Sequence, residues 1–472
     1  MQDSKLIDLM RKLSSAQVRQ FDRWLPALVV VQNNEIQRLF QHLIGFAPQY
    51  KSSKLERKKV QQTLGWNAKK LTDRSSLLLQ LLGQCLIIEQ VLNDPLEQQL
   101  RLMDIFEQLD LDKHFQTAKR QAHKTLDGTQ RRGTTLLQQQ HRLRELEARA
   151  QETYQRQHKP SLQLATDALD EFYLANKLSY LLEMTSAGSV LDIPYEIRLA
   201  EAVKHWAQQA PFSDSPLIKL YHATIQLVEE PEQQNHFLQL RELLQQHEPS
   251  IPLLQLKQLY TYLLNYCTRR ITKVGDATYY QHYLDINTRL IDQGLLLEDG
   301  LLLPWRYSNL ITVGLRTGKM QWTHNFLENY RTYLPPEDSE NTYNFNLAHY
   351  LYYKQAFDEA LLLLLQIDLR DPLLAIAAKN LMAKIYWETD QTELLLTFLE
   401  NYRLYIYRQQ LAKKHLKQQV KNFIDVTRRM AKIPDFEPEK YQELLDTLPL
   451  ASDMLEHEWL RKQLQDRCTS KH

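Results

Sequence analysis

The sequence predicts an all-α protein in which a helical head is followed by a solenoid of stacked helix pairs. Only 11 of the 472 residues are glycine and 17 are proline, whereas β-sheets need many tight turns. Apolar residues recur at helical spacing, and proline or glycine interrupts the chain at intervals typical of repeated helix pairs. A chain of this length also exceeds what one compact core normally holds.

Residues 1–94 are predicted to form an N-terminal helical domain. Its longest helix is expected from about Asn67 to Asn93, where Pro95 stops the run. The most apolar part of that helix, Leu77 to Ile88, contains two glutamines and is too short to span a bilayer. No membrane association is therefore expected.

Residues 95–159 are expected to be connecting long helices. Between Gly133 and His158 the apolar residues narrow to one thin row that contains Leu136, Leu143 and Ala150. A single narrow row indicates a largely exposed helix. This segment is the best candidate for the boundary between head and repeats.

Three further segments complete the predicted organisation. Residues 160–300 have the rhythm of degenerate helix-pair repeats, with breaks such as Pro211 to Pro216. Residues 301–409 form more regular repeats, and residues 410–472 are expected to be C-terminal capping helices. In the first capping helix, Leu416, Val420, Phe423 and Ile424 form the apolar side, whereas Lys413, Lys414, Lys417, Lys421 and Arg428 line the other side.

The segment from Leu303 onward resembles tetratricopeptide repeats, a family of helix pairs with small residues where the two helices cross. The clearest copy holds Leu347, Ala348, Leu351, Phe357, Ala360, Leu364, Ile367 and Pro372 at the repeat positions. An earlier copy holds Leu310, Ile311, Gly314, Gly318, Met320, Thr323, Leu327, Tyr330 and Pro335, and a later one Met382, Ala383, Tyr386, Asp390, Thr392, Leu395, Leu399 and Tyr402. The resemblance implies a right-handed α-α solenoid with a concave groove.

A wider part of the chain looks like an uncharacterised family of bacterial helical-repeat proteins of similar length. The likeness is carried by the block Gly294 to Gly300 with Pro304 and Trp305, by the run Tyr343 to Tyr350, and by the head segment Lys54 to Leu82. It implies fold and extent, and it implies no activity.

Charge and cysteine content bound the environment of the protein. The 58 basic residues balance 57 acidic ones, so the whole molecule has no net field that would attract nucleic acid or an anionic membrane. Three widely separated cysteines, Cys85, Cys267 and Cys468, are typical of a reducing compartment. The first residues lack the apolar run of a signal peptide, so a cytoplasmic location is expected.

No pattern in the sequence predicts catalysis, and no cofactor is expected. Gly318 and Lys319 are followed by Met320, where a phosphate-binding loop needs serine or threonine. No glycine has a serine two positions later, so a nucleophile elbow is absent. His457 and Glu458 resemble the start of a helical zinc motif, but Arg461 occupies the position of the second histidine. The protein is therefore expected not to be an enzyme.

The leading functional hypothesis is a non-enzymatic scaffold or adaptor that binds a protein or peptide segment in the concave groove. Aromatic residues with polar tips suit such a groove because they bury a large area at low entropic cost. The repeat register turns the following candidates toward the groove: Trp305, Arg316, Phe345, His349, Tyr352, Tyr353, Asn380, Lys384 and Trp387. The alternative that Tyr352 and Trp387 pack between helices is equally favoured, because aromatic stripes at helical spacing usually belong to the core.

The alternative function is a regulator with a nucleic-acid-binding basic head and a repeat sensor domain. Two helices joined at Gly65-Trp66-Asn67 could present a helix-turn-helix to phosphates. Its candidate contacts are Lys58, Lys59, Lys69 and Lys70. The apolar residues of the second helix indicate burial instead, and a solvated basic face is the favoured interpretation.

Overall fold

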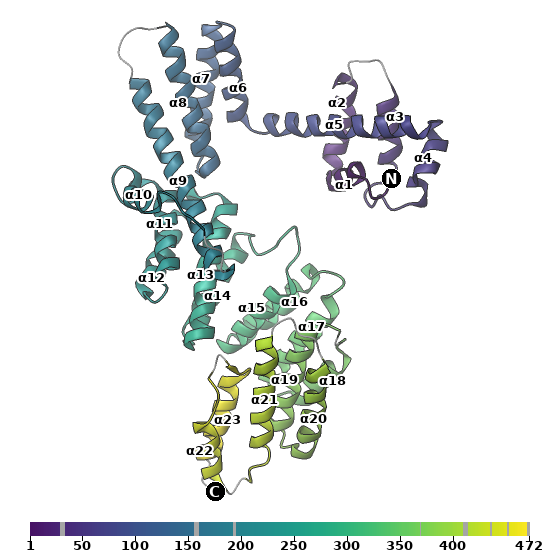
Figure 1. The fold of residues 1–472 in the computed structure, drawn as a ribbon, viewed down its shortest axis with the longest axis vertical. Coiled ribbons are helices and arrows are strands. Elements are labelled where there is room, and N and C mark those ends of the chain that lie inside the picture. Colours follow the sequence, from purple (N-terminus) through teal and green to yellow (C-terminus); the bar gives the residue numbers. More distant parts are fainter. Residues whose placement is uncertain are drawn as a thin grey trace. The chain divides into compact units, whose positions relative to one another are not determined.

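The computed structural model describes residues 1–28, 34–154, 160–191, 195–368, 370–408, 414–434, 437–450 and 453–469. These ranges contain 23 α-helices and no β-strand (Figure 1), which confirms the all-α prediction. The chain divides into two compact units, residues 1–173 and 174–472. Proline occupies the first helical turn in several helices, including those that begin at Pro95, Pro216, Pro304 and Pro372, where its missing N–H costs nothing.

The head consists of five helices around one apolar core. They are α1 (Lys5–Lys12), α2 (Ser15–Leu28), α3 (Asn34–Ile44), α4 (Arg57–Leu64) and α5 (Ala68–Leu92). Phe21, Phe40 and Leu82 are fully buried in this core. Gly65 ends α4 in the left-handed conformation, with φ of 71°, and the Asn67 side chain accepts a hydrogen bond from the Lys70 N–H in the first turn of α5. The punctuation predicted for α5 is therefore confirmed.

Helix α5 is longer than the apolar segment Leu77 to Ile88, which was predicted to be too short to span a bilayer. It is the one helix in the described residues that is long and apolar enough, by length and composition, to cross a membrane, and 22% of its most apolar window is buried. Leu71, Leu78 and Leu82 of α5 pack in the head core. By contrast, Ile87 and Leu92 are 64% and 51% exposed.

The rest of the first unit contains a bundle of α6 (Pro95–Gln108), α7 (Asp112–Gly128) and α8 (Thr134–Tyr154). The expectation that α8 is largely exposed is wrong. Leu143, Leu146 and Ala150 are buried against α6 and α7, and the 5% exposed Glu147 is paired with Arg144 at 2.9 Å. The sequence prediction treated polar residues such as Glu147 and Arg144 as facing solvent, but they form an ion pair within the bundle. His158 lies outside the described residues.

The second unit begins within α9 (Pro160–Leu191) and continues as helices packed against their neighbours in sequence. They are α10 (Ala200–Ala207), α11 (Pro216–Glu229), α12 (Gln234–His247), α13 (Leu253–Arg269), α14 (Tyr279–Asp292), α15 (Pro304–Arg316), α16 (Met320–Tyr330), α17 (Ser339–Tyr353), α18 (Phe357–Gln366), α19 (Pro372–Glu388), α20 (Thr392–Arg408), α21 (Lys414–Met430), α22 (Pro438–Asp446) and α23 (His457–Thr469). Helices α11 to α20 pack as successive pairs, and α17 also touches α15 and α19. This arrangement is consistent with helical repeats.

Small residues stand where the predicted helix pairs cross. Ala348 and Ala360 are fully buried between α17 and α18. At Gly314 of α15, an added Cβ would collide with the Thr323 hydroxyl of α16. Both observations follow the repeat register, because small residues let two helices approach closely.

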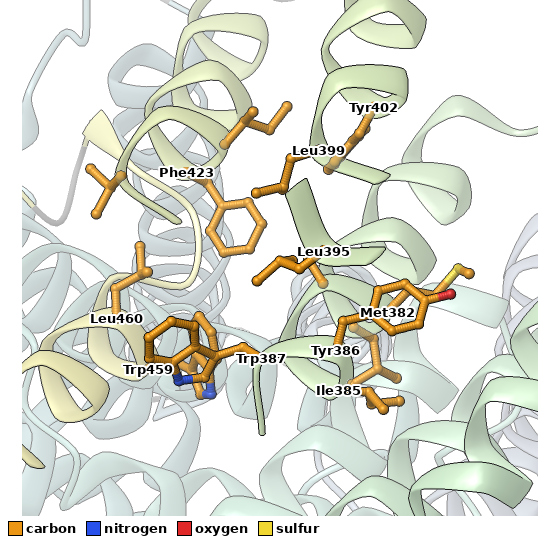
Figure 2. Packing of buried hydrophobic residues seen from close by; sticks show 14 of the residues in the cluster. Met382, Ile385, Tyr386, Trp387, Leu395, Leu399, Tyr402, Phe423, Trp459 and Leu460 are labelled. Atoms are coloured by element: carbon orange, nitrogen blue, oxygen red, sulfur yellow. The ribbon is translucent and has the colours of Figure 1, made fainter. Parts of the chain in front are cut away.

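One apolar cluster joins the last helices of the chain. It contains residues of α19, α20, α21 and α23, among them Trp387, Leu399, Phe423 and Leu460 (Figure 2). Val420, Phe423 and Ile424 of α21 are buried, so the predicted apolar side of the capping helix is confirmed. Lys413 lies outside the described residues.

Candidate functional site

The sequence-predicted groove residues lie on three helices of the second unit. We call the side of α15, α17 and α19 that carries them the groove face. Trp305 and Arg316 are on α15, and Phe345, His349, Tyr352 and Tyr353 are on α17, whereas Asn380, Lys384 and Trp387 are on α19. Because α17 touches both of the other helices, these residues come from adjoining elements.

Exposure divides the groove face into an uncovered and a covered part. Trp305 is 59% exposed and Tyr353 is 37% exposed. Tyr352 and Trp387 are 9% and 7% exposed, and Lys384 is buried to the same degree. Phe345 and His349 are half-buried. Tyr352 and Trp387 are thus buried, as the packing alternative predicts, and Trp305 is exposed. Binding of a partner along a groove stays a prediction.

Asn380 was predicted to face the groove, but it lies inside the α19/α20 pair instead. It is 3% exposed, and its side-chain oxygen accepts a hydrogen bond of 2.8 Å from the hydroxyl of Tyr402 on α20. Tyr402 is itself fully buried. Asn380 therefore satisfies a buried phenol inside the α19/α20 pair, as buried polar groups require.

The covered part of the groove face is occupied by the C-terminal segment of the chain itself. The Trp387 indole N–H donates to the Gln463 side-chain oxygen at 2.9 Å, and the Trp459 indole N–H donates to a Glu388 carboxylate oxygen at 2.7 Å. The hydroxyl of Tyr352 donates to the same Glu388 oxygen. These reciprocal bonds tie α23 to the ends of α17 and α19.

Ion pairs reinforce the docking of the C-terminal segment. Lys384 Nζ lies 3.0 Å from a carboxylate oxygen of Glu456, and Arg316 pairs with Glu458. The Lys384 ammonium also lies 4.9 Å from the centroid of the Tyr352 ring and 5.8 Å from that of Trp459. A buried cation that has both a carboxylate and aromatic faces around it is well compensated.

Sequence reasoning missed the covering role of this segment. Glu456 has a φ of 55°, a left-handed conformation that is uncommon outside glycine, at the entry to α23. Trp459, Leu460 and Leu464 then belong to the apolar cluster that joins the last helices of the chain. One feature of the sequence could have indicated this covering role. Glu456, Glu458 and Trp459 are acidic and aromatic residues that lie next to the apolar residue Leu460.

His349 is a half-buried imidazole at the border between the two parts. Its Nδ1 has no hydrogen-bond partner. Burial lowers the pKa of His349 to about 3, and the nearby positive charge of Lys384 acts in the same direction. His349 is therefore neutral at neutral pH.

Acidification is expected to destabilise the second unit through His349. Because the folded-state pKa lies below the ordinary value of 6.5, the unfolded chain binds more protons, and stability is lost as pH falls below 6.5. The slope contributed by one such group is at most about 1.4 kcal/mol per pH unit. Denaturant unfolding of the wild type and of His349→Gln at pH 7 and pH 5 measures this contribution. Equal slopes in the two proteins would contradict it.

The four lysines proposed for nucleic acid differ in their surroundings. Lys59 pairs with Glu56 at 3.4 Å, and Lys70 pairs with Glu35. Lys58 and Lys69 are exposed. Two of the four charges are thus neutralised within the head, which reduces what α4 and α5 offer to phosphates.

The possible metal ligands and the cysteine thiols do not form a site within the described residues. Within the described ranges, no group of three or more histidine, cysteine, aspartate or glutamate residues could hold a metal ion. Cys85 and Cys267 are buried, and burial raises the pKa of Cys85 to about 11 and that of Cys267 further. Both thiols are therefore protonated at neutral pH, which is the unreactive form.

Comparisons with protein-family models, curated proteins and solved structures gave no match to this chain. The class of protein is thus defined by the architecture alone: an all-α chain of sequentially packed helix pairs.

Proposed function

We propose that this protein is a non-enzymatic scaffold that binds a segment of another protein along the uncovered part of the groove face, within a tetratricopeptide-like solenoid. The observation that carries the proposal is the position of α23. A helix of the chain already lies on this face through indole hydrogen bonds and ion pairs. The face therefore has the chemistry to hold a helical or extended segment.

The uncovered part is centred on Trp305. Its indole is 59% exposed, and neighbouring groove-face positions are polar, including Ser308, which accepts a hydrogen bond of 2.8 Å from the Asn346 side chain. That bond fixes α15 against α17, so the aromatic group projects from a rigid support. Exposed tryptophans on rigid elements are typical centres of binding energy in protein interfaces.

Site-specific photo-cross-linking tests this proposal. A benzophenone amino acid at position 305 is expected to capture one discrete protein partner in cells that produce the full chain. The matched control carries the same group at Leu362, which is 62% exposed on α18. Capture of the same proteins at both positions would contradict a specific groove.

A further inference from the structure

A cavity on the head combines positive charge with hydroxyl groups. Its volume is about 350 Å³, and small-ligand pockets usually measure about 300 to 1,000 Å³. It lies where the start of α1 and the first residue of α4 meet the N-terminal half of α5. Its polar lining consists of the cations Lys5 and Arg57 and the hydroxyl-bearing residues Ser4, Thr72, Ser75 and Ser76. No aspartate or glutamate is among the described residues that line it.

Arg57 is held at the cavity by neutral groups. Its Nη2 donates to the Ala68 carbonyl oxygen at 3.4 Å and to the Thr72 hydroxyl. The adjacent carboxylate, Glu56, pairs with Lys59 at 3.4 Å instead. Among the described residues, the Nη1 and Nε donors of Arg57 have no hydrogen-bond partner. The guanidinium is therefore oriented against α5 and still has donors for a ligand.

Lys5 gives the cavity its second cation. Lys5 is exposed on α1, and Asp8, one turn later, pairs with Arg11 at 3.0 Å. Within the described part of the chain, Lys5 forms no ion pair. The head as a whole is also basic, because residues 1–94 contain 14 lysines and arginines against 8 aspartates and glutamates. Anions are therefore attracted to this part of the molecule.

Helix α5 supplies hydroxyls and an apolar group to the cavity from one of its faces. Thr72 and Ser76 are four residues apart, so their side chains lie one above the other, and both are exposed. Leu79 follows three residues later on the same face and is half-buried. Hydroxyl groups thus lie beside the cations, and an apolar side chain lies one turn further along the helix.

We propose that this cavity binds a small phosphomonoester, with the phosphate at Lys5 and Arg57 and the organic group toward Leu79. A phosphomonoester carries a charge of about −1.5 to −2 at pH 7 and three acceptor oxygens, which match two cations and the neighbouring hydroxyls. A carboxylate has one charge and two oxygens, so it would leave part of this lining unused. Arginine and lysine are both common phosphate ligands in proteins.

This inference is independent of the proposed function. The cavity belongs to the first unit, whereas the groove face belongs to the second. The four lysines that were candidates for nucleic-acid contact do not line it. A water-soluble phosphate ester and the headgroup of phosphatidic acid share the required chemistry, and the experiments below distinguish these two sources.

Saturation-transfer NMR on the full chain, with phenyl phosphate as the probe, tests the cavity. Phenyl sulfate is the control ligand, because it has a similar shape and only one negative charge. We expect phenyl phosphate to bind more tightly than phenyl sulfate. Arg57→Gln should weaken phenyl phosphate binding about tenfold, as loss of a charge-assisted hydrogen bond predicts. The matched control Lys58→Gln removes a charge from the next residue, which is exposed and outside the cavity, and should leave binding unchanged.

A second variant tests the same cavity without altering Arg57. Ser76 is exposed and makes no side-chain hydrogen bond with a described residue, so Ser76→Asp should fold normally, which circular dichroism checks. Its carboxylate would repel a phosphate, and we expect phenyl phosphate binding to be lost. Undiminished binding to Ser76→Asp, or an equal loss in Arg57→Gln and Lys58→Gln, would show that the probe responds to the overall charge of the head and would overturn the inference.

Co-sedimentation with phosphatidylcholine vesicles, with and without phosphatidic acid, identifies the source of the phosphate. Sedimentation that requires phosphatidic acid, is lost in Arg57→Gln and is retained in Lys58→Gln assigns the site to a lipid headgroup. Binding of phenyl phosphate without such sedimentation assigns it to a water-soluble ester. If neither probe binds in a manner that depends on Arg57, the inference is wrong.

Discussion

Replacing Trp387 with alanine is expected to lower the free energy of unfolding of the second unit by about 3 to 5 kcal/mol. The indole is 7% exposed and belongs to the apolar cluster that joins α19 to α21 and α23. Truncation removes that packing and also leaves the Gln463 side-chain oxygen, which accepts the indole N–H at 2.9 Å, without this donor. Chemical denaturation followed by circular dichroism measures the loss.

The chain supplies a matched control for Trp387 on the same face. Trp305 is the same residue type and is 59% exposed, so Trp305→Ala should change stability by no more than about 0.5 kcal/mol. A large loss for Trp305, or a negligible one for Trp387, would show that the division of the groove face is misplaced. Because Trp305 can be altered without unfolding the chain, a loss of partner binding in Trp305→Ala would not result from unfolding.

Replacing Lys384 with methionine is expected to lower the free energy of unfolding of the second unit by about 3 kcal/mol. Removing one partner of a buried ion pair typically costs 3 to 5 kcal/mol, because the other charge stays behind. The lower end applies because the Glu456 side chain retains 26% exposure, although that of Lys384 retains only 8%. Burial alone would raise the pKa of Glu456, but the Lys384 ammonium outweighs it and keeps the pKa below 4.5.

A second substitution at Glu456 tests the cause of that loss. In the variant Lys384→Met/Glu456→Leu no charge is left uncompensated, so most of the lost stability should return. The control is Arg428→Met, which breaks a surface pair with Glu400 at 2.9 Å and should cost less than about 1 kcal/mol. If the double variant is no more stable than Lys384→Met, the loss comes from the aromatic contacts of Lys384 instead.

Local features of the fold could be predicted from the sequence because their causes are local. The bounds of α5 follow from a cap at Asn67 and a stop before Pro95, and both are set by neighbouring residues. The small residues Ala348 and Ala360 are buried where the repeat register places them. Helical periodicity also identified Val420, Phe423 and Ile424 as a buried side.

The candidate site could be predicted only in part because its other half comes from a distant segment. Tyr352 and Tyr353 are adjacent, yet one is 9% exposed and the other 37%. Tyr352 packs against Phe357 of α18 and donates its hydroxyl to Glu388 of α19, and periodicity within α17 carries no information about these partners. The pairing of Lys384 with Glu456 could not be predicted either, because the two residues are far apart in the sequence.

The position of Trp459 gives the chain a built-in optical reporter. The Trp459 and Trp387 indoles are both buried, and their N–H groups are bonded across the α19/α23 contact, whereas Trp206 and Trp305 are more than half exposed. Solvent around an indole shifts its fluorescence to longer wavelength. Departure of α23 alone would therefore shift the emission of Trp387 and Trp459 to longer wavelength, while the circular dichroism of the other helices persisted. Undocking of α23 and unfolding of the remaining helices can thus be followed separately in one sample.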